Sequence, residues 1–247
     1  MDVVATVQAR MGSSRLPGKM MLPLAGEHVL THDIQRINTA KNIDQMVVAT
    51  STKNADDIIE RYAGKAGAAV FRGSESDVLD RMFRAADQAD ADIVVRITGD
   101  CPLLSPKVID TVVEKLVETS ADYSSNIIER TFPRGLDIEA FTFESFEKVH
   151  RQASSPHQRE HVTLYYHENP NTFDLVNVGS DDVFEEPWMH DRTDLRLTLD
   201  EADDYELLRT IYETVPYTGL LDVRDAIKCV DENELYHLNK HVEQKTT

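Results

Sequence analysis

The chain has little sulfur and no long apolar run. Its only cysteines are Cys101 and Cys229 among 247 residues, which is too few for a disulfide framework or a zinc site. A small buried side chain accounts for Cys101 better than a reactive thiol does. No apolar stretch is long enough to cross a bilayer and no signal peptide precedes the first expected strand, so we expect a cytoplasmic protein with no membrane partner.

Basic residues are also scarce. Lys and Arg number 26 against 44 Asp and Glu, which gives a formal net charge of -18. Nucleic-acid binding requires a basic surface, so this balance predicts no nucleic-acid partner. An acidic surface stays soluble at high salt, where charge repulsion is screened, and we therefore expect a halophilic protein. The 41% of hydrophobic residues is typical of a globular chain.

Apolar runs and amphipathic stretches alternate through the first half. The expected strands are 3–7, 46–49, 69–71 and 93–97, and the expected helices are 28–40, 55–66, 77–89 and 106–118. This alternation predicts an α/β fold with a mostly parallel central sheet and helices on both faces. The second half is less regular, with strands expected at 122–126, 173–178 and 195–199, a turn at 134–139 that leads into a strand, and helices at 142–152, 157–167, 201–214 and 223–233. We see no internal repeat or linker, and interpret residues 1–247 as one domain.

The segment Arg10–Lys19 reverses the sign of the chain. It carries Arg10, Arg15 and Lys19 without any acid, and its glycines and serines let backbone amides approach an anionic ligand. Three cations can spread over several phosphates, so this loop is a candidate polyphosphate site. It is neither a Walker A motif, since Met20 follows the lysine, nor the GxGxxG dinucleotide pattern. A turn with solvated charges is the alternative.

Two aspartates follow later strands. Asp100 lies on a tight turn after the strand 93–97. Ligands of parallel sheets bind at the carboxyl ends of strands, so Asp100 is expected near the cationic loop. Mg2+ takes one or two carboxylates together with substrate phosphates. Asp200 follows the expected strand 195–199 and is either a second ligand or the N-cap of the next helix, with Asp203 reinforcing its first turn.

One family shares these motifs. The string Gln8-Ala9-Arg10-Met11-Gly12-Ser13-Ser14-Arg15-Leu16-Pro17-Gly18-Lys19 and the element Gly99-Asp100-Cys101-Pro102 resemble the cytidylyltransferases that activate acidic sugars. These include CMP-KDO synthetase, acylneuraminate cytidylyltransferase and, most closely, the spore-coat polysaccharide biosynthesis protein F group. The resemblance implies a Rossmann-like nucleotidyltransferase fold related to glycosyltransferase A domains. It also implies that CTP and an acidic sugar give CMP-sugar and pyrophosphate, with Mg2+ as the cofactor and a homodimer as the assembly.

The resemblance implies roles for individual residues. Residues of about 1–120 would form a nucleotide-binding half, and those of about 121–247 a half that binds the sugar, completes the metal site and contacts the second subunit. Asp100 and Asp200 would bind the metal, and Arg10, Arg15, Lys19 and Asp100 would be catalytic. The nucleotide-binding positions are Gln8, Ala9, Arg10, Gly12, Ser13, Arg15, Lys19, Arg72, Ser74, Arg81, Thr98 and Gly99. Arg81 is the main candidate contact to the base, although residues 74–81 alone indicate only a capped helix start.

Sugar-binding candidates lie in the second half. They are Arg134, Asp137 and Glu139 in a turn that resembles the spore-coat group, and Arg159 as the anchor for a sugar carboxylate, with Arg192 and Arg196 as alternatives. A hairpin turn with solvated charges accounts for the 134–139 segment equally well. The histidines at 157 and 161 indicate a metal only weakly, because a third ligand is missing from their spacing.

Two rival functions remain open. A nucleotide-sugar-dependent glycosyltransferase usually needs an Asp-x-Asp motif at a strand end, whereas Asp90-Ala91-Asp92 precedes its strand. A catalytically inactive nucleotide-binding subunit is the second rival, against which the intact cations and aspartates argue. The segment Arg96-Ile97-Thr98 departs from the Asn-Val-Gln that precedes Gly-Asp in CMP-KDO synthetase, so the sugar stays open.

Overall fold

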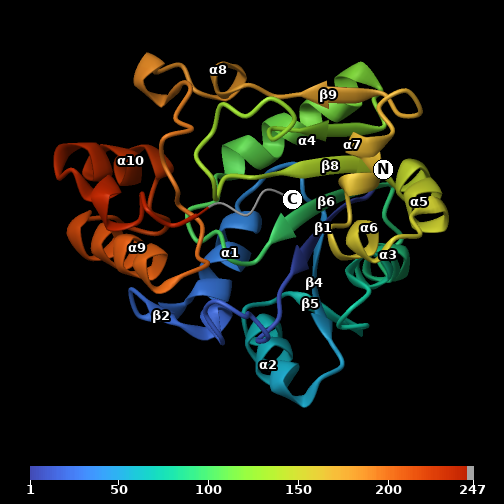
Figure 1. The fold of residues 1–247 in the computed structure, drawn as a ribbon, viewed down its shortest axis with the longest axis horizontal. Coiled ribbons are helices and arrows are strands. Elements are labelled where there is room, and N and C mark those ends of the chain that lie inside the picture. Colours follow the sequence, from blue (N-terminus) through green and yellow to red (C-terminus); the bar gives the residue numbers. More distant parts are fainter. Residues whose placement is uncertain (244–247) are drawn as a thin grey trace.

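A seven-stranded sheet joins both halves of the chain (Figure 1). The structure is a computed structural model that describes residues 1–243. The sheet has the order β5-β4-β1-β6-β8-β7-β9. Its strands are β1 (Val3–Gln8), β4 (Gln45–Ser51), β5 (Ala69–Gly73), β6 (Ile93–Thr98), β7 (Tyr123–Ser125), β8 (Glu139–Thr142) and β9 (Leu175–Asn177), and β2 (Pro23–Leu24) pairs with β3 (Glu27–His28) apart from it. Strand β8 runs antiparallel to β6 and β7 while the other pairs of the sheet are parallel, which confirms the expected mostly parallel sheet.

Helices cover both faces of this sheet, as expected (Figure 1). They are α1 (Val29–Ile37), α2 (Asp57–Lys65), α3 (Val78–Gln88), α4 (Pro106–Thr119), α5 (Phe143–Gln152), α6 (Pro156–Glu160), α7 (Leu164–Glu168), α8 (Ser180–Val183), α9 (Ala202–Thr214) and α10 (Val223–Glu232). Short 3-10 turns lie at Lys19–Met21 (η1), Asn54–Asp56 (η2), Pro187–Met189 (η3) and Leu235–Leu238 (η4). Within residues 1–243, no helix has both the length and the apolar character that crossing a membrane requires.

The buried strands feed two hydrophobic cores. In β1, Val3, Ala5 and Val7 pack in a core with α1, α4, α9 and α10, whereas Val4 packs on the other face with α3 and α5. Successive residues of a strand face opposite sides. A parallel sheet that is covered on both sides is therefore apolar on both faces, which explains the uninterrupted apolar run of β1.

The carboxyl ends of β1 and β6 lie side by side. Gln8 stands opposite Thr98 in the parallel register, and the Gly99 amide donates a hydrogen bond to the Gln8 carbonyl at 3.0 Å. The Leu199 amide donates to the Asp100 carbonyl at 2.9 Å. The loop after β1, the turn after β6 and the segment before α9 consequently meet at one edge of the sheet.

The structure corrects two expected elements. Residues 157–167 form α6 and α7 instead of one helix, because Val162 adopts a left-handed φ of 52° between them. Residues 195–199 form no strand: Arg196 makes a single isolated bridge to Arg134. One bridge does not continue into a ladder, although the leucines of this segment are buried as in a strand.

The start of α9 also differs from the expectation. Its N-cap is Glu201 and not Asp200. The carboxylate of Asp204 accepts hydrogen bonds from the amides of Asp200 and Glu201, at 2.9 and 3.0 Å. The side chain of Asp200 is thereby free to face the cations of the β1 loop. The remaining expected elements are present with ends shifted by a few residues.

Candidate active site

The loop after β1 folds back on its own backbone. The carbonyl of Met11 accepts hydrogen bonds from the amides of Ser13 and Gly18, at 2.9 and 3.0 Å. Gly18 has a φ of 76°, a left-handed conformation that glycine adopts without steric cost. This turn delivers Lys19 into η1, where only 7% of the residue is exposed.

Lys19 lies between the two predicted metal ligands. Its Nζ is 2.7 Å from Oδ2 of Asp100 and 2.8 Å from Oδ1 of Asp200. Arg15 Nη2 reaches the same oxygen of Asp200 at 3.0 Å. These side chains line a cavity of about 220 Å³, the loop cavity, together with Gln8, Arg10, Ser13, Ser14, Met20 and Thr98. The predicted loop cations and both aspartates therefore share one cavity.

The charges in the loop cavity compensate one another. Burial lowers the pKa of Lys19, but the carboxylates of Asp100 and Asp200 outweigh it and raise the pKa overall. Burial raises the pKa of Asp200, but Lys19, Arg15 and Arg196 reverse the direction, so this carboxyl titrates below its usual range. Opposite charges at hydrogen-bonding distance favour the charged form of both partners. Lys19 and Asp200 are thus both ionised at neutral pH.

The donor set fits a hard divalent cation that binds together with a substrate. The carboxylates of Asp100 and Asp200 already converge on one positive atom, the Nζ of Lys19. Within residues 1–243, no group of three or more His, Cys, Asp or Glu side chains is arranged to hold a metal ion. Mg2+ commonly takes one or two carboxylates and completes its shell with water and phosphate oxygens. A metal at Asp100 and Asp200 therefore needs oxygens from a bound ligand.

A second cavity adjoins the loop cavity at Arg10 and is called the Arg10 cavity. It measures about 520 Å³ and is lined by Arg10, Glu75, Ser76, Asp77, Val78, Pro156, Arg159 and Glu160. Arg81 lies behind this wall, where its Nη1 donates to the carbonyls of Ser74 and Glu75. Its Nε and Nη2 have no partner among the described residues. Burial and the neighbouring Arg10 lower the pKa of Arg81 to about 10.

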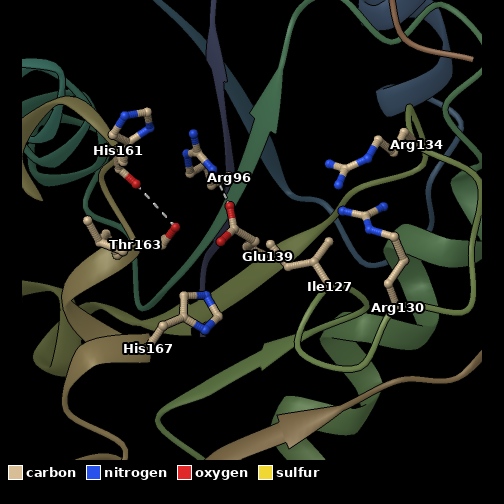
Figure 2. Close-up of a pocket in the computed structure, with 9 residues that line it drawn as sticks. Arg96, Ile127, Arg130, Arg134, Glu139, His161, Thr163 and His167 are labelled. Carbon is tan, nitrogen blue, oxygen red and sulfur yellow. Dashed lines mark hydrogen bonds and ion pairs between the residues drawn. The ribbon is translucent and has the colours of Figure 1, made fainter. Parts of the chain in front are cut away.

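A third cavity, the arginine pocket, contains three arginines in its lining (Figure 2). It measures about 320 Å³ and is lined by Arg96, Ile127, Arg130, Arg134, Glu139, His161, Thr163, Leu164 and His167. Arg96 connects it to the loop cavity, because its Nη2 donates to Oε1 of Gln8 at 3.4 Å. Figure 2 shows Arg130 and Arg134 near each other at one end of the pocket, and Glu139 beside Arg96.

Cations outnumber acids in the arginine pocket. Asp137 binds Arg130 through both carboxylate oxygens, at 2.6 and 2.8 Å, and Glu139 forms an ion pair with Arg96. Among the described residues, the guanidinium of Arg134 forms no hydrogen bond or ion pair, and the carboxylate of Asp137 acts on it only as a nearby charge. Burial and the nearby charge of Arg130 lower the pKa of Arg134. A cation held in this way favours an anionic group on a ligand.

Three other predicted arginines lie outside the arginine pocket. Arg159 lines the Arg10 cavity, where its Nε contacts Oδ2 of Asp77 at 2.7 Å. Arg72 forms an ion pair at 2.6 Å with an acid of α2. Arg192 forms an ion pair at 2.8 Å with an acid of α10. The structure therefore separates Arg134 from Arg159 and Arg192, which the sequence offered as carboxylate anchors.

Two sequence features lie apart from this chemistry. Asp92 accepts a hydrogen bond from the Asp2 amide at 2.7 Å, at the start of β6 and away from the loop cavity, so Asp90-Ala91-Asp92 is no metal motif for this site. Cys101 is 3% exposed. Burial raises the pKa of its thiol well above the usual range, and Asp100 adds to the effect. The thiol stays protonated and unreactive, in line with the expectation of a small buried side chain.

Sequence reasoning missed Arg130 and Asp204. Arg130 lies four residues before Arg134, and this pair of nearby arginines in an acidic chain was the available signal. Asp204 is 0% exposed. Its signal was the regular spacing of one arginine and two aspartates, Arg196, Asp200 and Asp204, each four residues from the next.

Comparisons with known proteins show to which family this chain belongs. Residues 4–221 match a family model described as cytidylyltransferase. The chain belongs to the cytidylyltransferase family. It is 33% identical over 217 residues to the spore coat polysaccharide biosynthesis protein SpsF of Bacillus subtilis, covering 86% of this chain and 87% of that protein. It is 38% identical over 249 residues to an uncharacterized protein of Methanocaldococcus jannaschii, covering 100% of this chain and 98% of that protein.

Solved structures place this cytidylyltransferase in the same fold. A cytidylyltransferase from Leptospira borgpetersenii has a TM-score of 0.89 at 34% identity, covering 99% of this chain and 100% of that chain. The CTP complex of CMP:2-keto-3-deoxy-manno-octonic acid synthetase has a TM-score of 0.62 at 16% identity, covering 86% and 99%, a likeness that shows the fold alone. The family resemblance and the nucleotidyltransferase fold are confirmed, and the protein is a nucleotidyltransferase.

Proposed function

We propose that this protein transfers the cytidylyl group of CTP to an acidic sugar of the nonulosonate or KDO class. A hydroxyl oxygen of the sugar attacks the α-phosphorus in line and forms a new C–O–P linkage. The bond between the α- and β-phosphates breaks, pyrophosphate leaves, and the hydroxyl proton passes to solvent. The CMP-sugar would serve the synthesis of a surface polysaccharide or glycan, and we keep a cytoplasmic homodimer as the expected state.

The loop cavity supports a place for the triphosphate. Arg10, Arg15 and Lys19 line it, and preorganised cations stabilise the charge that grows on a leaving group. Once phosphates bind, Lys19 and Arg15 can contact them in place of the carboxylates that they now neutralise. Mg2+ held by Asp100 and Asp200 would supply further neutralisation of the phosphate charge.

The Arg10 cavity supports a place for the nucleoside. It adjoins the loop cavity at Arg10, which lines both. Arg81 has two buried nitrogens without a partner in the described chain, and a cytosine ring offers acceptor atoms to such donors. We therefore keep Arg81, beside Ser74, as the proposed base contact, and assign Arg72 to holding the end of β5 against α2 through its ion pairs.

Arg134 carries the acidic-sugar part of the proposal. It is a cation without an acid partner within residues 1–243, in a pocket of about 320 Å³. A sugar carboxylate would form charge-assisted hydrogen bonds with it. His161 lines the same pocket, and burial lowers the pKa of this imidazole, so the neutral ring and the Thr163 hydroxyl offer partners for sugar hydroxyls.

The ion pairs around Arg134 suggest supporting roles. Asp137 holds Arg130 and Glu139 holds Arg96, so these acids orient the cations of the pocket. Arg134 thus replaces Arg159 as our proposed carboxylate anchor. The hydrogen bond from Arg96 to Gln8 supports a sugar site in this pocket beside the proposed triphosphate site.

Pyrophosphate release tests this function. The assay combines Mg2+ and high salt with each ribonucleoside triphosphate, and offers KDO, neuraminic, legionaminic and pseudaminic acids in turn. We expect release with CTP and one of these acids. Consumption of nucleotide-sugars with release of nucleoside diphosphate would establish the glycosyltransferase rival instead. Tight CTP binding without turnover across the panel would establish an inactive subunit.

An Arg134→Gln variant tests the carboxylate anchor. A charge-assisted hydrogen bond contributes about 1.5–3 kcal/mol, so the KM for the acid should rise about tenfold to a hundredfold while the KM for CTP stays within about twofold. With a carboxamide analogue of the sugar, the variant and the wild type should converge. Arg151→Gln, an exposed arginine paired with Glu147 on α5, is the matched control. A rise in both KM values would contradict the assignment.

A further inference from the structure

We propose that Asp204 and Arg196 are positioning residues that orient Asp200 toward a divalent cation. The inference rests on the proposed function, because Asp200 is there a metal ligand. Asp204 is 0% exposed and Arg196 is 8% exposed, and neither lines the loop cavity. Both act through Asp200.

Asp204 is saturated with hydrogen-bond donors. Its Oδ1 accepts from Arg196 Nε at 2.8 Å and from Asn239 Nδ2 at 2.9 Å. Its Oδ2 accepts from the amides of Asp200 and Glu201, at 2.9 and 3.0 Å, and from Arg196 Nη2 at 3.1 Å. A buried carboxylate with five donors has a fixed orientation. It therefore ties the backbone of Asp200 and the guanidinium of Arg196 to the start of α9.

Arg196 determines which oxygen of Asp200 faces the loop cavity. Its Nη2 is 2.8 Å from Oδ2 of Asp200. The other oxygen, Oδ1, faces Lys19 at 2.8 Å and Arg15 at 3.0 Å. The hydrogen bond to Arg196 thus prevents rotation of the carboxylate and presents Oδ1 to the cation.

Charge balance gives Asp204 a second effect. Arg196 by itself would neutralise Asp200 and repel a divalent cation. The carboxylate of Asp204 cancels the charge of Arg196, so Asp200 keeps its negative charge for the metal. Partners of this kind typically change metal affinity by about 10–100-fold when they are mutated.

Mn2+ binding to the full chain in the presence of CTP tests the inference. Free Mn2+ is measured by electron paramagnetic resonance, so the readout does not depend on turnover. In Asp204→Asn, the Kd for Mn2+ should rise about 10–100-fold, while the KM for CTP at saturating Mn2+ stays within about twofold. Asp203→Asn is the matched control: its side chain is exposed and contacts His241 at 2.8 Å, so its Mn2+ affinity should equal that of the wild type.

Two further variants separate the possible outcomes. Arg196→Lys keeps the charge but loses the forked guanidinium, so it should weaken Mn2+ binding. This variant tests the positioning role independently of whether Asp204→Asn folds. Asp200→Asn should abolish Mn2+ binding to the protein in the presence of CTP. An Asp200→Asn variant with wild-type affinity would overturn the proposed metal site itself. Loss of binding in Asp200→Asn with unchanged affinity in Arg196→Lys and Asp204→Asn would overturn only the positioning role.

Discussion

The free energy of unfolding of an Asp33→Asn variant is expected to increase relative to that of the wild type as the pH rises. Asp33 lies on α1 and is 0% exposed, and neither of its carboxylate oxygens has a hydrogen-bond partner among the described residues. Burial raises the pKa of Asp33 well above the usual range, and the charge of Asp100 adds to this. Together they outweigh the opposite effects of Arg36, of the nearby Cys101 backbone and of Lys19. The folded protein therefore retains a proton that the unfolded chain releases.

The sign of the pH dependence follows from this raised pKa. In the unfolded chain, the carboxyl of an aspartate has a pKa of about 3.9. Between that value and the folded pKa, the folded state binds more protons, so the contribution of Asp33 to the free energy of unfolding falls as the pH rises. Each pH unit in this interval costs at most about 1.4 kcal/mol. Asparagine does not titrate, so the variant escapes this loss.

Urea unfolding without metal or nucleotide measures the effect. From about pH 5 to 8.5, the difference in unfolding free energy between Asp33→Asn and wild type should grow by at most about 1.4 kcal/mol per pH unit, and level off above the folded pKa. The unpaired asparagine amide adds a constant cost of about 1–3 kcal/mol, so the slope is the test. Asp87→Asn, an exposed aspartate on α3, is the matched control and should show no slope.

A difference that stays flat from about pH 4 to 8.5 would refute the reasoning, because the folded-state pKa of Asp33 would then not lie above that of the unfolded chain. A difference that shrinks as the pH rises toward about pH 4 from below would also refute it. That result would mean that Asp33 is ionised in the folded chain and stabilised by Arg36.

Two substitutions and one labelling experiment have distinct expected outcomes. Lys19→Met should lower the kcat of pyrophosphate release by about 10²–10³-fold. It should also strengthen Mn2+ binding in the absence of CTP, because no ammonium then neutralises the carboxylates of Asp100 and Asp200. Weaker Mn2+ binding by the variant would contradict this role of Lys19. Gly135→Ala should lower the free energy of unfolding by at least about 1–3 kcal/mol. Gly135 has a φ of 101°, and a Cβ at this position would lie 2.5 Å from the carbonyl carbon of Leu197. Wild-type stability in urea would contradict this and mean that the turn relaxes. Cys101 should react with iodoacetamide only after unfolding, because burial raises the pKa of its thiol. Fast labelling of the native protein at Cys101, identified by mass spectrometry, would be inconsistent with that burial.

The sequence by itself determined the parallel strands of the first half and the cationic loop. The apolar run of β1 and the glycine at the φ of 76° before Lys19 are local features, and a strand or a turn needs little beyond its own residues. The rule that ligands gather at the carboxyl ends of parallel strands then predicted that the loop and Asp100 share one edge. The loop cavity contains both.

Tertiary structure decided which side chains are engaged and which are available. Arg134 and Arg159 are both arginines in polar segments, yet Arg159 binds Asp77, 82 residues away in the sequence, while Arg134 faces a pocket. Burial of Asp204 against Arg196 likewise depends on the packing of α9 and η4. Pairing and desolvation of charges arise from segments far apart in the chain, so composition and spacing predicted where the site lies, and only the fold decided what each charge contacts.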